Sequence, residues 1–240
     1  MTEKCLTEIV DSKEIAAGIA FNETLNPVLW DGDDLKLEVR IALLKSALAF
    51  IKFLDLDEFQ MTDVILTGSN ASYNYTKFSD CDVHLVSDFT ETAFPDIAAN
   101  FFTTKKTLWN ETHDALIHDY PVELYVQDVG EPLQASGIYS ILKGEWVVHP
   151  TRNKPKWNDS AVEAKTNGLA DEIDEIVSTS ADKPIIDKMF LKLKALRKSG
   201  LEKNGEFSVE NLAFKALRNL GYIGRLADAR RAAEDRDLSV

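Results

Sequence analysis

The sequence of 240 residues contains only two cysteines, Cys5 and Cys81. Two thiols cannot form a disulfide framework, and Cys81 falls in an apolar run that predicts a core-facing position, so reduced thiols in a reducing compartment are expected. The N-terminus lacks a charged-then-apolar leader, and no apolar run approaches the roughly 18 residues of a membrane span. We therefore expect a cytoplasmic protein without membrane contact.

Basic residues are scarce in the first part of the chain. Lys and Arg number 27 against 40 Asp and Glu, which gives a net charge of −13. Residues 1–150 hold 10 basic and 25 acidic residues, whereas residues 151–240 hold 17 and 15. This acidic balance disfavours long nucleic acid as a partner, because binding to it depends on neutralising many phosphates. Within residues 183–231 the balance is +7, which is compatible with a solvated helical face or with an anion-binding surface.

The spacing of apolar residues before residue 150 predicts a small mixed sheet backed by helices, an α+β arrangement. A turn-rich N-terminal arm at 1–33, with a short helix at 11–19, precedes this core domain at 34–150. The expected helices are at 35–54, 69–75 and 93–110, and the expected strands are at 64–67, 81–86, 113–118 and 121–127. Residues 136–148 are expected to form a short helix and a final extended piece.

Helical signals alone follow a Pro-containing stretch at 150–158, which predicts a domain boundary there and an all-helical C-terminal domain at 151–240. Four helices are expected. The first is capped at Ser160 and ends near Val177, and the second begins at Asp182 and Pro184 and ends at Gly200. The third is capped by Ser208 and closed by Gly221, and the fourth covers 224–234.

The stretch 63–88 contains the residues with the clearest chemistry. An apolar run ends in Gly68-Ser69, and after a ten-residue gap a second run opens with Asp80-Cys81-Asp82. Side chains alternate along a strand, so Asp80 and Asp82 share one face with His84. A strand that ends in Gly-Ser before a helix predicts a phosphate site, because helix N-termini present backbone N–H groups.

Asp-x-Asp on a strand supplies two of the oxygen ligands that Mg²⁺ prefers, although the same pattern also occurs at exposed strand ends. The Gly-Ser pair upstream favours the metal site. Glu123 is the preferred third acid because it lies in the middle of a predicted strand among apolar neighbours. Its competitors are Asp114, Asp119 and Asp128.

Over roughly residues 35–128 the chain resembles the nucleotidyltransferases related to DNA polymerase β. The resemblance is carried by Gly68-Ser69, by Asp80-x-Asp82 and by a later acid on a strand. The resemblance implies that Gly68 and Ser69 hold nucleotide phosphates, that Asp80 and Asp82 bind two Mg²⁺ or Mn²⁺ ions, and that Glu123 completes the second ion site. It also implies transfer of an NMP from an NTP, such as ATP, to a hydroxyl acceptor with release of pyrophosphate. That acceptor could be a small molecule, a protein, an RNA end or another nucleotide.

This sequence departs from many small members of the superfamily because residues 70–75 contain no Arg. Lys188 and Lys192, on the predicted basic helix after Asp182, are expected to supply the missing charge to the triphosphate. Further candidates around the site are His84, Lys105, Lys106 and Tyr125. Two alternatives stay open: a metal-dependent Asp-x-Asp glycosyltransferase, which does not need Gly-Ser, and a non-catalytic nucleotide-binding or antitoxin-like module.

Overall fold

The computed structural model describes residues 19–56, 58–132, 135–152 and 156–239. The helix predicted at 11–19 lies outside these residues except for Ile19. Two compact units account for the described chain: residues 20–152 form one, and Ile19 with residues 156–239 forms the other. None of the described helices is both long enough and apolar enough to cross a membrane.

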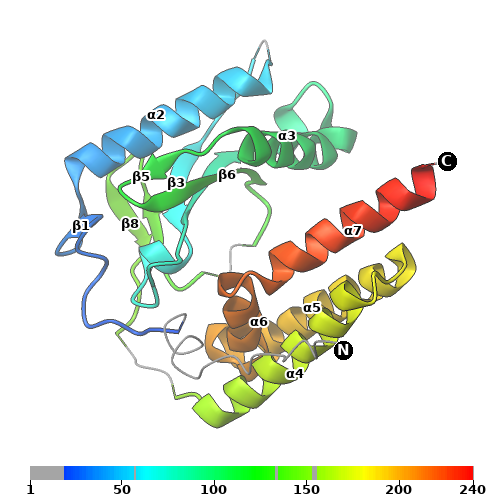
Figure 1. Ribbon diagram of the computed structural model, residues 1–240. Helices are drawn as coiled ribbons and strands as arrows, with labels where there is room; N and C mark the ends of the chain where they lie inside the picture. The colour runs from blue at the N-terminus through cyan, green and yellow to red at the C-terminus, as the bar shows by residue number, and fades with distance from the viewer. Residues whose placement is uncertain (1–18, 57, 133–134, 153–155, 240) are drawn as a thin grey trace. The chain divides into compact units, whose positions relative to one another are not determined.

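The first unit is built on a six-stranded mixed sheet with the order β5-β6-β4-β3-β7-β8 (Figure 1). Its strands are β3 (Asp63–Thr67), β4 (Cys81–Ser87), β5 (Leu116–Ile117), β6 (Tyr120–Asp128), β7 (Ile138–Ser140) and β8 (Glu145–Val148). The pair β4 and β6 is parallel, and the other neighbouring pairs are antiparallel. A mixed sheet combined with helices is compatible with the predicted α+β class.

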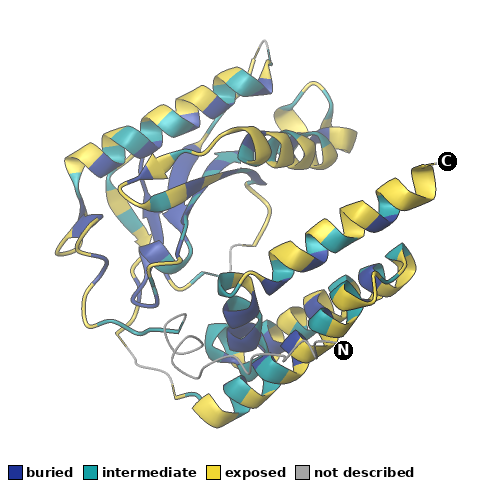
Figure 2. Cartoon of the chain, viewed as in Figure 1, coloured by how far each residue is buried: buried dark blue, intermediate teal, exposed yellow. Residues whose placement is uncertain are grey.

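Helices α2 (Leu37–Leu54) and α3 (Ala98–Thr112) cover one face of this sheet. Alternate residues of the central strands point toward them. Along β4 buried residues alternate with partly buried ones, and Figure 2 shows both kinds within the sheet. The shared core includes Phe50, Leu66, Val83, Phe102 and Leu124. Because these side chains use one face of each strand, the intervening residues lie on the opposite face of the sheet.

Helix α3 begins five residues later than predicted. Two short 3₁₀ turns, η2 (Phe89–Glu91) and η3 (Pro95–Ile97), precede it. Pro95 explains the difference, because proline lacks the N–H that an interior helical position needs and restricts the residue before it.

The prediction for 136–148 was wrong in part, since the expected short helix is absent and the segment forms the hairpin β7–β8. Tyr139 pairs with Leu66 of β3, so this hairpin extends the sheet. Trp146 stacks on Trp30 with ring centroids 4.8 Å apart. Trp30 belongs to a small N-terminal hairpin of β1 (Trp30–Asp31) and β2 (Asp34–Leu35). The contact between Trp30 and Trp146, which lie more than 100 positions apart in the sequence, therefore outweighs the local helical spacing of apolar residues.

The regular elements that the structure describes in the second unit are all helices. Its elements are α4 (Asp159–Ser178), α5 (Lys183–Asn204), η4 (Gly205–Phe207), α6 (Val209–Asn219) and α7 (Tyr222–Leu238). Ser208 caps α6 as predicted, because its side chain accepts a hydrogen bond from the backbone N–H of Asn211. The predicted cap at Ser160 was wrong, since the side chain of Asn158 accepts from Ala161 instead. The fourth helix begins two residues before the expected Gly224.

Gly200 does not end α5, which continues to Asn204. The residue is buried, and a Cβ at this position would lie 2.6 Å from the Ser208 Oγ and 2.8 Å from the Glu210 Cβ. Gly200 therefore permits close packing of α5 against the start of α6, which local sequence patterns cannot distinguish from a helix stop.

Gly200→Ala is expected to lower the free energy of unfolding by about 1–3 kcal/mol, because the new methyl group overpacks this contact. Gly168→Ala in α4 is the matched control, since nothing lies within 4 Å of a Cβ there. Helix propensity alone should make the control more stable by about 0.5–1 kcal/mol. Urea unfolding of both variants measures the difference, and stabilisation by Gly200→Ala would contradict the close packing.

Candidate metal centre

The strand register places Asp82 between two neighbours on the sheet face away from α2 and α3. Asp82 pairs with Thr67 of β3 on one side and with Glu123 of β6 on the other. The adjacent residues Cys81 and Val83 are buried on the helix-covered face, as the alternation predicted. Asp82 and Glu123 are therefore lateral neighbours with both carboxylates on one face.

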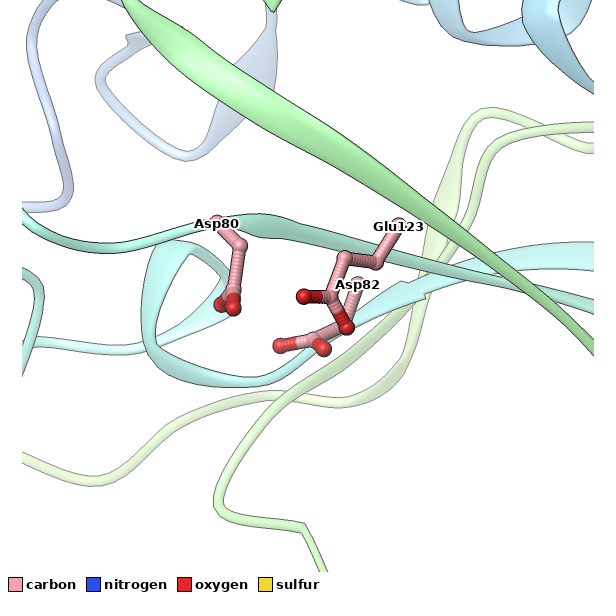
Figure 3. Close-up of side chains that lie close together, drawn as sticks. All are labelled: Asp80, Asp82 and Glu123. Carbon is pink, nitrogen blue, oxygen red and sulfur yellow. The ribbon is translucent and has the colours of Figure 1, made fainter. Parts of the chain in front are cut away.

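Asp80 joins them from the residue just before β4. One carboxylate oxygen from each of Asp80, Asp82 and Glu123 lies within 4.8 Å of the others, and Figure 3 shows the three side chains converging. Asp80 and Asp82 are partly buried, and Glu123 is exposed. No other group of three or more potential ligands among the described residues meets this criterion, so the structure brings together Glu123 and not Asp114, Asp119 or Asp128.

The donor set fits a hard divalent cation. Mg²⁺ binds oxygen at about 2.1 Å, so two ligands of one ion lie at most about 4 Å apart, close to the observed spacing. Three carboxylates this close repel one another, and a cation among them would relieve that repulsion. Oxygen ligands without His or Cys favour Mg²⁺ or Mn²⁺ over softer metals.

Gly68 lies directly against this cluster. Its backbone has φ 75° and ψ −160°, a region that is essentially restricted to glycine. A Cβ at Gly68 would meet the Oδ2 of Asp82 at 1.9 Å. Glycine is therefore required both by the backbone conformation and by the position of a carboxylate in the cluster.

The short helix predicted at 69–75 is limited to the 3₁₀ turn η1 (Ser69–Ala71). A turn of this length has too few aligned peptide groups for a substantial helix dipole, so phosphate binding there would depend on local backbone N–H groups and side chains. The Ser69 Oγ donates a hydrogen bond to the Ser79 Oγ at 2.8 Å, which ties the turn to the residue before Asp80. The role of Gly68 and Ser69 toward phosphates stays a prediction.

Asn70 is a positioning residue that sequence reasoning missed. It is fully buried, and its Nδ2 donates to the backbone carbonyl of Asp80 at 2.9 Å. Its Oδ1 accepts from Asn26 at 2.9 Å, and its own carbonyl accepts from the Trp30 indole at 2.8 Å. Asn70 thus links the Gly68 turn, the Asp80 backbone and the N-terminal segment. The sequence marks Asn70 only as a turn-forming residue after Gly-Ser. Its two N-terminal partners lie at least 40 positions away, so local patterns could not reveal these contacts.

His84 and Tyr125 share the face of the cluster but have partners of their own. The Nδ1 of His84 lies 2.7 Å from the Oε1 of Gln127, and its ring contacts Tyr125 edge-on at 5.1 Å. Burial lowers the pKa of His84 despite that hydrogen bond. Tyr125 donates to Glu131 at 3.0 Å. His84 is therefore held by residues of the neighbouring strand β6, and a role for it in the chemistry of the site stays a prediction.

The lysines named from the sequence lie in different places. Lys188 and Lys192 are exposed on α5 of the second unit, where Lys192 pairs with Glu172 at 2.5 Å. Their contact with a nucleotide stays a prediction. In the first unit, Lys105 donates to the carbonyl of Phe53, and the Nζ of Lys106 lies 5.0 Å from the centre of the Tyr125 ring. Lys106 therefore places a positive charge over Tyr125, which lies two residues after Glu123 on β6.

Cys81 lies between the two aspartates in sequence but is fully buried on the opposite face. Burial, with a smaller contribution from Asp80 and Asp82, raises the pKa of its thiol to about 12. The thiol is therefore protonated at neutral pH, and Cys81 is a core residue rather than a metal ligand or nucleophile.

Gly68→Ala is expected to weaken Mn²⁺ binding by roughly tenfold or more, because the methyl group displaces the Asp82 carboxylate. Gly32→Ala provides the control: Gly32 also has positive φ, at 60°, but nothing lies within 4 Å of its Cβ position. Titration of free Mn²⁺ by electron paramagnetic resonance measures both variants. Equal losses would mean that backbone strain, and not the carboxylate contact, explains the requirement for glycine.

Asn70→Ala is expected to lower the free energy of unfolding by about 1–3 kcal/mol, because buried hydrogen-bonding groups lose their partner. It should also weaken Mn²⁺ binding, since the backbone of Asp80 loses its anchor. Urea unfolding and Mn²⁺ titration measure the two effects. Unchanged Mn²⁺ affinity in the folded variant would show that Asn70 is structural only.

In comparisons with known proteins, no family model, no curated protein and no solved structure matches this chain. The functional interpretation therefore depends on the residues themselves: three converging carboxylates beside a glycine turn.

Proposed function

We propose that this protein is a metal-dependent nucleotidyltransferase that moves an NMP from an NTP to a hydroxyl acceptor. The observation that carries the proposal is the convergence of Asp80, Asp82 and Glu123 within 4.8 Å beside the Gly68 turn. The six-stranded mixed sheet is compatible with a nucleotidyltransferase core, and the helical residues 156–239 with a C-terminal domain of the same enzyme.

Asp80 and Asp82 would hold two Mg²⁺ or Mn²⁺ ions, and Glu123 would complete the second site. When bound, such ions neutralise phosphate charge and favour the deprotonated form of an attacking hydroxyl. The need for them follows from the charges of the site, since three carboxylates would otherwise repel a triphosphate. Gly68 has no side chain, so the Asp82 carboxylate of the proposed ion site can lie directly against the turn.

In the proposed reaction the acceptor oxygen forms a bond to the α-phosphorus. The bond from that phosphorus to the bridging oxygen breaks, and pyrophosphate leaves with the electron pair. The acceptor hydroxyl gives its proton to a solvent water molecule during this step. Glu123 is the exposed carboxylate of the cluster, and we assign to it the position nearest the acceptor. The main contribution of the chain is to hold both reactants in line.

Positive charge for the triphosphate would come from Lys188 and Lys192 of α5, and Lys106 offers a further cation within the first unit. Both lysines of α5 are exposed. The excess of acidic residues in the first 150 positions favours a small or protein acceptor over long nucleic acid. We propose a small-molecule, protein, RNA-end or nucleotide hydroxyl as the acceptor class.

The test incubates the purified chain with Mg²⁺ or Mn²⁺, each α-labelled NTP and separate small-molecule, protein and RNA acceptor pools. Labelled NMP should appear in one pool together with pyrophosphate. Asp82→Asn and Glu123→Gln should each lower this transfer by roughly 100-fold or more, because they remove charge that stabilises the reacting complex.

Glu145→Gln is the matched control, an exposed acid on β8 of the same sheet, and it should keep full transfer. Transfer that survives Asp82→Asn would contradict the proposed site. Absence of transfer from every NTP, together with Mn²⁺-dependent hydrolysis of a sugar nucleotide, would favour a glycosyltransferase instead.

A further inference from the structure

Helix α2 carries a second row of apolar side chains besides the row that packs on the sheet. The row packed on the sheet consists of Val39, Leu43, Ala47, Phe50 and Leu54. The second row, which we call the outer row, lies about 120° around the helix from the first and consists of Leu37, Ile41, Leu44, Leu48 and Ile51. Leu37 is 68% exposed, Ile41 43% and Leu48 62%. A helix that met only water on this side would carry polar residues there.

The outer row has the spacing of a helix that pairs with another helix. Its residues follow one another after four, three, four and three positions, which is the heptad pattern of paired helices. Single exposed apolar residues are common, whereas a continuous row of them marks an interaction surface. Leu142, which is 43% exposed, widens this surface, because its carbonyl accepts a hydrogen bond from the Nη2 of Arg40 on α2 at 2.8 Å.

Charged residues follow one side of the outer row. Glu38, Lys45 and Lys52 are all exposed, and none of them takes part in an ion pair among the residues that the structure describes. They recur every seven residues, so they occupy one position of the heptad beside the apolar row. In paired helices such flanking residues meet charges of the other helix and set its direction and register.

A second copy of α2 in the antiparallel direction matches this pattern. Leu37 then lies opposite Leu48 of the second copy, and Ile41 lies opposite Leu44. The most exposed residues of the outer row are therefore covered. Two-fold symmetry makes each of these contacts twice, because the same surface is used on both copies.

The charges select this arrangement over the alternatives. In the antiparallel register just described, Glu38 faces Lys45 of the second copy, and the contact occurs twice. A shift by one heptad would place Lys45 against Lys45 of the second copy. Parallel helices would instead bring Lys45 close to Arg40 of the second copy. Both alternatives bring like charges together, which costs affinity.

We propose that a second copy of this chain docks on the outer row, so that the protein forms a two-fold dimer through antiparallel α2 helices. The contact area is small, because one short helix and the turn at Leu142 supply it. We therefore expect a dissociation constant on the order of 1–100 μM. No residue of this surface belongs to the metal centre, so the dimer stands or falls independently of nucleotidyl transfer.

The experiment is sedimentation equilibrium of the full chain over a series of concentrations. The wild-type chain should change from monomer to dimer as its concentration rises. Leu48→Ser should weaken the dimer by roughly tenfold or more, because apolar surface is no longer removed from water in either copy. Leu191→Ser on α5 is the matched control, since Leu191 is 67% exposed and lies outside the outer row. Circular dichroism checks that both variants are folded.

Charge variants test the direction and register. Glu38→Lys and Lys45→Glu should each weaken the dimer by about fivefold or more, and their combination should restore it, because the opposite charges face each other again. A loss of folding would not be restored in this way. Lys52→Glu is the matched control, since Lys52 lies beyond the paired stretch, and it should leave the affinity unchanged.

Three results would each overturn the proposal. The first is a wild-type chain that stays monomeric up to roughly 500 μM, several times the upper end of the expected range. The second is a dimer that Leu48→Ser leaves as tight as before. The third is a Lys52→Glu variant that loses as much affinity as Lys45→Glu does.

Discussion

The lateral pairing of β4 with β3 on one side and with β6 on the other is the constraint on which the rest of the first unit depends. This register sets Asp82 beside Glu123, and like charges placed directly opposite each other destabilise a sheet. The opposite face offsets that cost, because Val83 and Leu124 are buried under α2 and α3. Burial of apolar side chains on one face stabilises the sheet, so the other face can hold Asp82 and Glu123 side by side despite their repulsion.

A second constraint is the close approach of the backbone at Gly68. The turn lies against the Asp82 carboxylate, and Asn70 holds it to the residue that begins the Asp-x-Asp pair. Asn26 and Trp30 complete this arrangement from the N-terminal segment. The N-terminal residues 20–35 thus belong physically to the core of the first unit, and the geometry of the acids depends on them.

The two units differ in charge. The first unit brings three carboxylates together on one face of its sheet, a set of oxygen ligands that fits a hard divalent cation. The second unit carries most of the basic residues on helices, and several of them pair with acids of the same unit.

Sequence patterns were sufficient for features that depend on neighbouring residues. The alternation of side chains along a strand placed Asp82 and Cys81 on different faces of the sheet. Helical spacing identified α2, and the apolar run around Glu123 identified β6. The hairpin β7–β8, the continuation of α5 through Gly200 and the role of Asn70 could not be predicted, because each depends on a partner remote in sequence. The sequence by itself therefore determined which acids are available and which of them share a face of the same strand. Only the tertiary structure decided that Glu123 joins Asp80 and Asp82, because strand order and register arise from packing across the whole sheet.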